Sequence, residues 1–549
     1  MEWPDATLYE GLREVADRNP DATALHFRGE RTTYAELLAE SRALSRGLAD
    51  LGVGSGDRVA VWLGNRPEWV TTQLAVSRLG AAAVAVNTRY RTHELEYMLR
   101  DSEASVLVTE DSFLDNDYLE MLADVVPEVR EDEPGAFDPD SLSSLDAVVG
   151  LTTDPAFPAV RGYDDVCDRD RERPPSVDAL DPTTDPDAPV TVFYTSGTTS
   201  DPKGCLQSSR SVLNHSYNVG EYLGLGPDDV ALGVLPFCGV WGYNTMLSAL
   251  SRGLPLVVET HFEPERTLDL VEAHGVTYCN AQAVMFDRMR RAEAFDPERV
   301  ATLRRGVTAF LTMGVDSEVF EDLEDAFGFP LVQPYGISEG NSMIFVGDPE
   351  DPLEQRKRVG GPRVHPDAAV RVADPQTGET LPAGEEGELC LRGYNVMNGY
   401  HDKPEQTAEA VDEEGWLHTG DLGVRDEAGY FYYRSRLDDA LRVRGFLVTP
   451  RDIEAALNGQ PGVDQAQVVG APHPRHGQVP VAFVIRGDDG EGSNLDAATL
   501  RESLAAEVAD YKVPEDVEFV DEFPRTEGPH GAKVRKGELR ERVADRYQE

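Results

Sequence analysis

The sequence predicts an α/β protein, with a large N-terminal domain of parallel-sheet α/β layers plus a small barrel-like β part, followed by a small α+β C-terminal domain. Three observations indicate this. Short apolar runs alternate with helix-length amphipathic segments through the first hundred residues, the texture becomes β-rich after Gly387, and a compact mixed module follows Arg436. Strands alternating with helices imply right-handed crossovers and a largely parallel sheet. A chain of 549 residues also exceeds what one core usually supports.

The first hundred residues supply the layered part of this prediction. Helices are expected at 7–18, 34–51, 67–79 and 94–100, and strands at 22–27, 57–63, 82–87 and 105–109. Residues 111–188 are rich in Asp, Pro and Ser, and we expect long irregular surface connections there. The alternation then resumes, with helices at 211–223 and 241–250 and strands at 254–259 and 277–280.

The last third of the chain predicts the two smaller parts. The stretch 387–400 reads as a strand pair with turns, and a further short strand is expected at 430–434. Beyond it, helices at 451–457 and 497–509 and strands at 465–469, 480–485 and 517–520 suit a small α+β domain. We place the boundary inside RSRLDDALRVRG, which gives domains at 1–437 and 438–549.

The charge of the chain narrows the class of function. Asp and Glu number 100 against 51 Lys and Arg, so the net charge of −49 would repel nucleic acid and anionic membranes. Adaptation to high salt is our interpretation, because the Debye length is only about 3 Å at 1 M salt and carboxylates keep a surface hydrated. The acidic N-terminus does not resemble a signal peptide, and no apolar run approaches membrane-spanning length. Five scattered cysteines favour a reduced cytoplasm.

A polar turn follows the apolar run at 189–193. The stretch YTSGTTSDPKG, from Tyr194 to Gly204, offers hydroxyls, glycines and one lysine, Lys203, in a chain that has only six lysines. Backbone N–H groups of such a turn can converge on an anion, and a lysine adds positive charge. A flexible Ser/Thr linker is the plain alternative. An ordinary nucleotide P-loop is excluded, because its lysine opens a helix and Lys203 is followed by Gly204.

Three further stretches carry groups that suit a nucleotide. VQPYGISEG, residues 332–340, presents an aromatic ring, a hydroxyl and the carboxylate of Glu339, which can hold Mg²⁺. GWLHTGDLG places Asp421 in a turn, where its carboxylate can accept both hydrogen bonds of a ribose diol. A surface loop and a self-satisfied turn are the plain readings of these two. Near the C-terminus Lys533, with Lys536 as the alternative, stands in a segment that otherwise reads as a solvated basic tail.

Taken together and in order, these blocks resemble the adenylate-forming superfamily of acyl-CoA synthetases, firefly-type luciferases and peptide-synthetase adenylation domains. The resemblance runs from about residue 30 to 540, and includes the hinge-like block RSRLDDALRVRGFLVTPRDIE. It departs from the family pattern at Ser200, Ser338, Leu447 and Ala532. Ser338 keeps the hydroxyl of the usual threonine, whereas Leu447 replaces a common basic residue that the family pattern assigns to a phosphate contact.

The resemblance implies a role for each site residue. Glu339 would bind Mg²⁺, Lys203 and Lys533 would act in catalysis, and Asp438 would be the hinge about which the small domain swings. Adenine packing falls to Tyr335, and the ribose to Asp421 and Arg436. The ATP-binding residues implied are Thr195, Ser196, Gly197, Thr198, Thr199, Lys203, Gln333, Tyr335, Gly336, Ser338, Asp421 and Arg436.

The resemblance also implies the reaction: a carboxylic acid and ATP give acyl-AMP and pyrophosphate, and a thiol then takes the acyl group. Coenzyme A is the expected thiol, because the chain ends just after the small domain as stand-alone acyl-CoA synthetases do. A non-catalytic or non-CoA nucleotide-binding protein and an oxidative, luciferase-like enzyme stay open, as does a homodimer. The acyl pocket is expected in the stretches 235–243 and 311–315, at Cys238, Gly239, Trp241, Met313 and Gly314.

Overall fold

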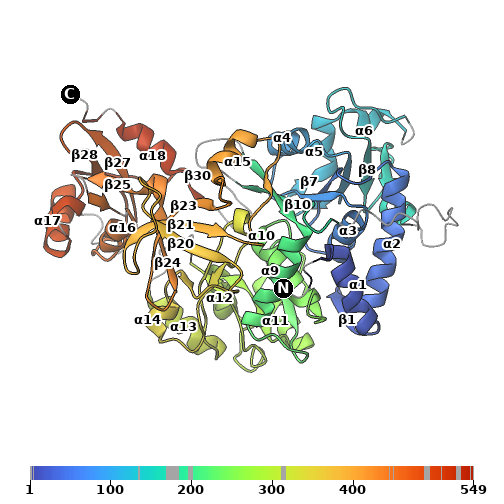
Figure 1. Ribbon diagram of the computed structural model, residues 1–549, viewed down its shortest axis with the longest axis horizontal. Helices are drawn as coiled ribbons and strands as arrows, with labels where there is room; N and C mark the ends of the chain where they lie inside the picture. Colours follow the sequence, from blue (N-terminus) through green and yellow to red (C-terminus); the bar gives the residue numbers. More distant parts are fainter. Residues whose placement is uncertain are drawn as a thin grey trace.

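The computed structural model describes residues 3, 5–133, 136–167, 185–195, 202–310, 317–443, 446–448, 450–487, 495–508, 510–526, 533–544 and 546–547 of the chain. Figure 1 shows an elongated molecule, with the C-terminal module at one end and the N-terminal helices toward the other. The predicted fold class is confirmed: layered parallel sheets, a strongly curved antiparallel sheet and a small α+β module follow one another along the chain.

An eight-stranded sheet forms the first layer of the large part. Its order is β22-β11-β10-β4-β3-β5-β8-β9, and the neighbours from β10 to β9 all run parallel. The bounds are β3 Arg58–Trp62, β4 Ala82–Ala85, β5 Val106–Thr109, β8 Ala147–Gly150, β9 Val160–Gly162, β10 Pro189–Thr195, β11 Lys203–Ser208 and β22 Gly399–Tyr400. The inner strands are apolar at nearly every position because helices cover both faces.

A second sheet, ordered β14-β12-β13-β1-β2, lies across a layer of helices from the first. Its strands are β1 Thr23–Phe27, β2 Glu30–Thr33, β12 Ala231–Gly233, β13 Leu256–Val258 and β14 Tyr278–Cys279. The helices between the two sheets share one apolar core with both and are α1 Leu8–Arg18, α2 Tyr34–Asp50, α3 Pro67–Arg78, α9 Ser209–Tyr222 and α10 Val240–Leu250. The large part therefore stacks sheets and helices in alternating layers.

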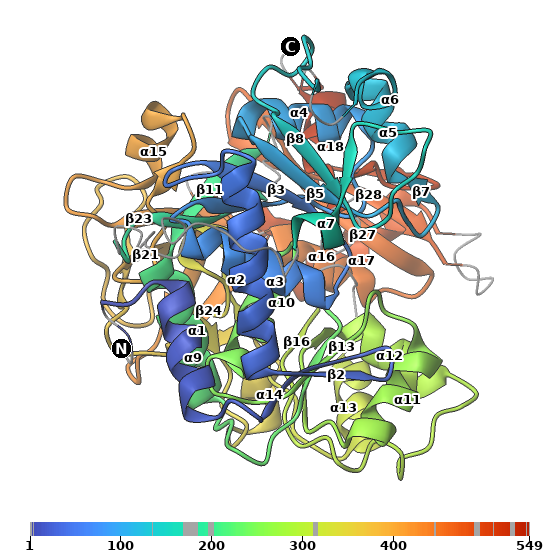
Figure 2. The same ribbon diagram turned by 90° about the vertical axis from the view of Figure 1, so that its right-hand side faces the viewer.

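The two outer faces are closed by different helices. α4 Thr92–Ser102 and α5 Tyr118–Val125 pack on the outer face of the eight-stranded sheet. The outer face of the second sheet is covered by α11 Pro264–His274, α12 Ala283–Arg291 and α13 Ser317–Phe327. Figures 1 and 2 show these two groups on opposite sides of the molecule. Each buries its apolar stripe against the sheet below it.

Local signals explain why several helices begin where they do. The hydroxyl of Thr33 accepts from the backbone N–H of Glu36, while the Glu36 carboxylate accepts from the Thr33 N–H. The same reciprocal capping box joins Thr7 and Glu10 at the start of α1. Each box satisfies two backbone donors that the first helical turn leaves unpaired. These caps and the apolar stripes account for the agreement of the helices with the sequence prediction.

The prediction of irregular connections at 111–188 was wrong for part of that stretch. Besides α5, it contains β8 and β9, which extend the eight-stranded sheet, and the short helix α7 Tyr163–Val166. β8 is four residues long, AVVG, and is fully buried. A strand this short between Asp- and Ser-rich segments gives too few alternations for periodicity to register.

A five-stranded antiparallel sheet ordered β19-β24-β23-β21-β20 forms the predicted barrel-like β part. Its strands are β19 Gly360–Gly361, β20 Ala369–Ala373, β21 Glu386–Arg392, β23 Leu417–Arg425 and β24 Phe431–Arg436. Leu389, Leu391 and Phe431 bury their side chains in a core that also contains Tyr335. This core joins the curved sheet to the segment that carries Glu339.

The C-terminal module has its own sheet and core. Strands β26 Phe446–Val448, β25 Leu441–Val443, β28 Gly477–Arg486 and β27 Val463–His473 lie in that order, and β29 Asp516–Phe519 pairs with β28. Helices α16 Pro450–Asn458, α17 Ala497–Glu507 and α18 Lys536–Val543 pack on it. The chain leaves the curved sheet at Arg436 and enters the module's sheet at Leu441. This change of sheet is consistent with a boundary at 437–438, and a hinge there stays a prediction.

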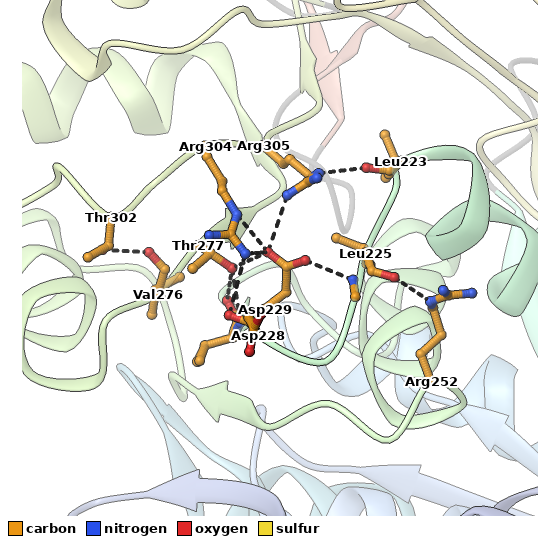
Figure 3. Close-up of polar contacts among 12 residues, drawn as sticks. Leu223, Leu225, Asp228, Asp229, Arg252, Val276, Thr277, Thr302, Arg304 and Arg305 are labelled. Atoms are coloured by element: carbon orange, nitrogen blue, oxygen red, sulfur yellow. Dashed lines mark hydrogen bonds and ion pairs between the residues drawn. The ribbon is translucent and has the colours of Figure 1, made fainter.

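A buried carboxylate ties together the loops at one end of the second sheet (Figure 3). Asp229, 2% exposed as a side chain, accepts from the hydroxyl of Thr277 at 2.7 Å. It also pairs with the guanidinium groups of Arg304, at 2.7 Å, and Arg305, at 3.3 Å. Arg305 in turn donates to the carbonyl of Leu223 at the end of α9. The cluster thus joins the turn before β12 to the segment after α12 that carries Arg304 and Arg305.

The described part of the chain can be examined for membrane-spanning helices and for disulfide bonds. Within it, no helix combines the length and the apolar character that a membrane crossing requires. All five cysteines are free thiols, and four of them are buried. This agrees with a fold that does not depend on disulfides.

Candidate active site

The turn after β10 is held at both ends by hydrogen bonds. β10 and β11 form an antiparallel hairpin in which Thr195 is the register partner of Lys203. The residues between them that we expected to hold phosphate, Ser196, Gly197, Thr198 and Thr199, lie outside the described residues. The Tyr97 hydroxyl donates to the carbonyl of Pro202 at 2.7 Å, which fixes the end of the turn.

The other end of the turn is anchored through Asp101 on α4. The hydroxyl of Tyr194 donates to one Asp101 oxygen at 2.8 Å, and the ammonium of Lys403 lies 2.6 Å from the other. All three side chains are largely removed from solvent. Both described ends of the segment between β10 and β11 are therefore held by side chains of the large domain.

Lys203 and Glu339 meet on either side of one tyrosine. The Lys203 ammonium lies 5.0 Å from the centroid of the Tyr400 ring, and the Tyr400 hydroxyl donates to Glu339 Oε1 at 2.7 Å. Burial, and then the nearby carboxylate of Glu339, raise the pKa of Tyr400 well above its usual value, so the phenol keeps its proton. Three separate sequence blocks therefore converge at this point.

The backbone around Glu339 is tightly constrained. It follows β17 Pro334–Tyr335 and lies in the single turn η1 Ser338–Gly340. Gln207 donates to the carbonyl of Ser338 at 2.5 Å, and the N–H of Met397 donates to the carbonyl of Glu339 at 2.9 Å. A Cβ at Gly336 would lie 2.4 Å from the backbone nitrogen of Met343, so only glycine fits there.

Backbone strain follows directly on this turn. Asn341, Ser342 and Met343 have φ values of 64°, 60° and 32°, in the left-handed region that non-glycine residues rarely adopt. Such conformations persist only where the surroundings enforce them, and they gather at functional sites. One contact that holds this backbone is between the Ser342 carbonyl and the buried ring of His215, whose Nε2 lies 2.8 Å away.

Tyr335, Asp421 and Arg436 form a second group beside the first. The Tyr335 hydroxyl donates to Asp421 Oδ2 at 2.6 Å, and Arg436 donates to Oδ1 at 3.1 Å. Burial raises the pKa of Asp421, and the Arg436 guanidinium partly offsets the rise. Each carboxylate oxygen keeps a second lone pair for a ribose hydroxyl.

The surroundings of Tyr335 bear on its expected role. It is 5% exposed and packs against Phe431 and Tyr433, with ring centroids 5.2 and 5.8 Å apart. This aromatic packing fixes the position of the ring, and adenine packing by Tyr335 stays a prediction. Gln333 is also buried, and its amide donates to the carbonyl of Lys357.

The expected acyl pocket lies at the start of α10. Gly239 is the N-cap of this helix, and Cys238 and Trp241 on either side are 6% and 7% exposed. Gly242 is required, because a Cβ there would lie 2.1 Å from the carbonyl oxygen of Pro236. Met313 and Gly314, the other expected pocket residues, lie outside the described residues.

The two lysines predicted near the C-terminus lie in different local structures. The Lys536 ammonium lies 2.6 Å from Glu454 Oε1, an oxygen that also accepts from the backbone of Val468. Lys536 is thus committed to the module's own core. The backbone of Lys533 instead forms β31 Lys533–Val534, paired with β30 Arg525–Thr526, and Asp438 lies in the turn η2 Leu437–Asp439.

Sequence reasoning missed Tyr400, Tyr97 and Asp101. Tyr400 is the last residue of the stretch 387–400, which we had read as a strand pair with turns. Its one available signal was a strong strand-former at a turn position. Tyr97 and Asp101 are spaced four apart on one helix face, which gives no hint of the turn a hundred residues later.

Two family models match most of the chain. The family model for AMP-binding enzymes matches residues 12–401, and the model for the AMP-binding enzyme C-terminal domain matches 452–528. The chain is 33% identical over 560 residues to 4-coumarate–CoA ligase 1 of Oryza sativa subsp. japonica, covering 98% of this chain and 92% of the relative. It is 29% identical over 549 residues to the long-chain-fatty-acid–CoA ligase of Bacillus subtilis, covering 95% and 92%.

A solved structure resembles the whole chain. The crystal structure of ATP-bound MatB from Rhodopseudomonas palustris matches with a TM-score of 0.79 and 26% identity, over 98% of this chain and 99% of that one. The expected reaction class, an AMP-forming acid–CoA ligase, is confirmed by these relatives. With a family model that spans most of its length, the chain belongs to the AMP-binding enzymes, among the ATP-dependent acyl-CoA synthetases.

Proposed function

We propose that this acyl-CoA synthetase activates its acid with Lys203, Glu339 and Lys533 acting on the phosphates, the cation and the carboxylate of the acid. The observation that carries the proposal is the contact of Lys203, Tyr400 and Glu339, which brings the phosphate turn and the carboxylate-bearing turn to one place. A lysine and a carboxylate poised beside a hydroxyl-rich turn suit a triphosphate with its counter-cation. ATP is therefore placed with its β- and γ-phosphates at the 195–203 turn.

Magnesium is implied by the family, and Glu339 fits it. The side chain offers a carboxylate oxygen held in place by the Tyr400 hydroxyl, and hard cations prefer such oxygen ligands. When bound, the cation would neutralise charge that develops on the phosphate oxygens. Tyr400 and the backbone contacts of η1 orient Glu339 before the nucleotide arrives.

In the first half-reaction an oxygen of the carboxylic acid attacks the α-phosphorus of ATP and pyrophosphate leaves, which gives acyl-AMP. Positioning and charge stabilisation dominate such chemistry, and the protein forms no covalent bond. Lys203 holds the departing phosphates, and Asp421 with Arg436 holds the ribose. Lys533 brings its charge to the carboxylate and the α-phosphate.

In the second half-reaction the sulfur of CoA attacks the acyl carbon and AMP leaves with the former carboxylate oxygen. We assign to Asp438 the rotation that withdraws Lys533 and admits the thiol. The change of sheet between Arg436 and Leu441 supports this assignment, because only a short turn connects the two parts there. A cytoplasmic location completes the proposal, on the ground of the five free thiols.

The test is pyrophosphate release across a panel of short, medium, long and aromatic carboxylic acids, with and without CoA. We expect acid-dependent pyrophosphate release, a thioester only when CoA is present, and no activity when Mg²⁺ is chelated. Binding of ATP without pyrophosphate release for any acid would contradict catalysis. Acyl-AMP formation that CoA never consumes would contradict CoA as the acceptor.

A further inference from the structure

Two neighbouring strands of the curved sheet bring together three side chains that the proposed reaction does not use. Glu388 and Cys390 are two residues apart on β21, so they share one face of the sheet, and His418 on β23 is the direct register partner of Cys390. The strands lie side by side in Figure 1. His418 Nδ1 is 2.9 Å from Glu388 Oε2 and 3.6 Å from Cys390 Sγ. The three ligand atoms all lie within 4.8 Å of one another.

We propose that Glu388, Cys390 and His418 bind one thiophilic divalent cation of the Zn²⁺ type. One thiolate, one imidazole and one carboxylate are a ligand set that Zn²⁺ accepts, with a water in the fourth position of the tetrahedron. Zn–S and Zn–N bonds of about 2.3 and 2.0 Å put sulfur and nitrogen about 3.5 Å apart. The observed separation of Cys390 and His418 is 3.6 Å, so this edge already has the required length. The distance of 2.9 Å between Glu388 Oε2 and His418 Nδ1 must lengthen by a few tenths of an ångström to admit the cation.

The outer contacts of the ligands match those of metal sites. Asp412 Oδ2 lies 3.5 Å from His418 Nε2, the ring nitrogen that faces away from the cluster. Metal-binding histidines usually donate that second N–H to a carboxylate. The other oxygen of Glu388 accepts from the N–H of Gly420 at 3.0 Å, which leaves Oε2 for the cation. Both hydrogen bonds orient a ligand before any metal arrives.

The charges of the cluster also suit a divalent ion. Glu388 and Asp412 bring two negative charges, and the Arg371 guanidinium, 3.6 Å from Asp412, brings one positive charge. Burial, and then the Glu388 carboxylate, raise the pKa of Cys390 to about 11, so the metal-free residue is a thiol. On binding, the thiol proton is released and the sulfur becomes a thiolate. A divalent cation with that thiolate brings the sum of these charges to zero.

The place of the cluster connects it to the nucleotide site. His418 and Gly420 flank Thr419 in the stretch that leads to Asp421, and all of them lie on β23. A cation there would fix the backbone that carries the ribose carboxylate without touching ATP. The proposal goes beyond the ligase function, because this site differs in ligand chemistry from the oxygen-only site of Mg²⁺. The side chain of His418 is 29% exposed, which leaves a path for entry.

The test uses Co²⁺ as a spectroscopic substitute, titrated into the chelator-treated full-length protein without ATP, acid or CoA. We expect a thiolate-to-cobalt charge-transfer band in the near ultraviolet that saturates at one equivalent, is displaced by Zn²⁺, and is accompanied by proton release. Cys390→Ser should abolish the band. Cys279→Ser is the matched control, since Cys279 is also fully buried with a raised pKa but belongs to no such cluster among the residues that the structure describes, and it should keep the band.

Two further variants keep the test decisive if Cys390→Ser does not fold. His418→Gln should remove the band, and Asp412→Asn should lower the Co²⁺ affinity about tenfold through its contact to the ring. Folding of each variant is checked by circular dichroism. Absence of a thiolate band in the folded wild type would overturn the proposal, as would a band that survives in His418→Gln. The readout does not involve catalysis, so its failure leaves the ligase function untouched.

Discussion

The Tyr400 hydroxyl donates to Glu339 Oε1 at 2.7 Å while the Tyr400 ring lies under the Lys203 ammonium. One side chain thus positions both the carboxylate proposed for Mg²⁺ and the lysine proposed for the phosphates. A hydrogen bond to a charged group contributes about 1.5–3 kcal/mol, and about 1.4 kcal/mol corresponds to a factor of ten. The relationship is therefore large enough to measure in kinetics.

Tyr400→Phe should keep the ring and lose the hydroxyl that orients Glu339. We expect the Mg²⁺ concentration at half-maximal pyrophosphate release to rise about tenfold, with little change in KM for the acid. Tyr9→Phe is the matched control, because its hydroxyl also bonds a charged group, Arg42, but far from the site on α1. An unchanged Mg²⁺ dependence in Tyr400→Phe would argue against binding of the cation by a Glu339 that Tyr400 orients.

Asp421→Asn should lower the preference for ATP over 2′-deoxy-ATP. If the carboxylate accepts from the ribose hydroxyls, the wild type prefers ATP, and the variant loses most of that preference while its KM for ATP rises about tenfold. Asp229→Asn serves as the control, since Asp229 is equally buried and paired with arginines but lies in the cluster of Figure 3. Discrimination that stays intact in Asp421→Asn would argue against ribose binding.

Glu259→Gln should stabilise the protein above neutral pH. Burial raises the pKa of Glu259 to about 7, although the Thr267 hydroxyl donates to it at 2.7 Å. The folded state therefore favours the protonated carboxyl, and the wild type loses stability as the pH rises from the unfolded pKa toward 7. The loss amounts to at most about 3 kcal/mol, at about 1.4 kcal/mol for each pKa unit.

The measurement for Glu259 is thermal unfolding of the wild type and Glu259→Gln between about pH 5 and about pH 8. The two melting temperatures should converge at the acid end and separate at the alkaline end, with the variant higher. Glu263→Gln, an exposed neighbour on the same loop, should follow the wild type at every pH. If the melting temperatures of all three proteins changed with pH in parallel, ionisation of Glu259 would not lower the stability of the fold.

The net charge of −49 should make stability depend on salt. Screening shortens the Debye length from about 10 Å at 0.1 M to a few ångströms in concentrated salt, which relieves repulsion among carboxylates. We expect a higher unfolding midpoint at about 3 M KCl than at about 0.1 M KCl. A lower midpoint in concentrated salt would contradict the interpretation of the charge as adaptation to high salt.

The helices of this protein were predictable because their signals are local. The apolar stripe and the capping box of α2 are complete within eighteen residues, and the helix begins at the predicted residue. β8 was missed because four apolar residues carry no period, and it is the pairing with the neighbouring strands β5 and β9 that makes AVVG a strand. Length alone was not sufficient, because α11 Pro264–His274 has 11 residues and was still not among the predicted helices.

The site was predictable in its motifs but not in its contacts. Glu339 and Lys203 could be proposed from their residue types and sequence blocks. Tyr400 lies beside them because β22 pairs with β11, which the local sequence does not indicate. The burial of Tyr335 likewise depends on Tyr433 and Phe431, a hundred residues later. Such long-range packing cannot be inferred from the local sequence around a tyrosine.

We propose that Lys533 serves acyl-AMP formation alone, and the two half-reactions of Lys533→Ala and Lys536→Ala distinguish this role from a general one. Acyl-AMP formation is followed as acid-dependent pyrophosphate exchange, and thioester formation from supplied acyl-AMP and CoA. We predict that Lys533→Ala loses about 10²–10³ in the first and keeps the second, while Lys536→Ala, whose lysine pairs with Glu454, keeps both. Equal loss of both half-reactions in Lys533→Ala, or selective loss in Lys536→Ala instead, would contradict the account.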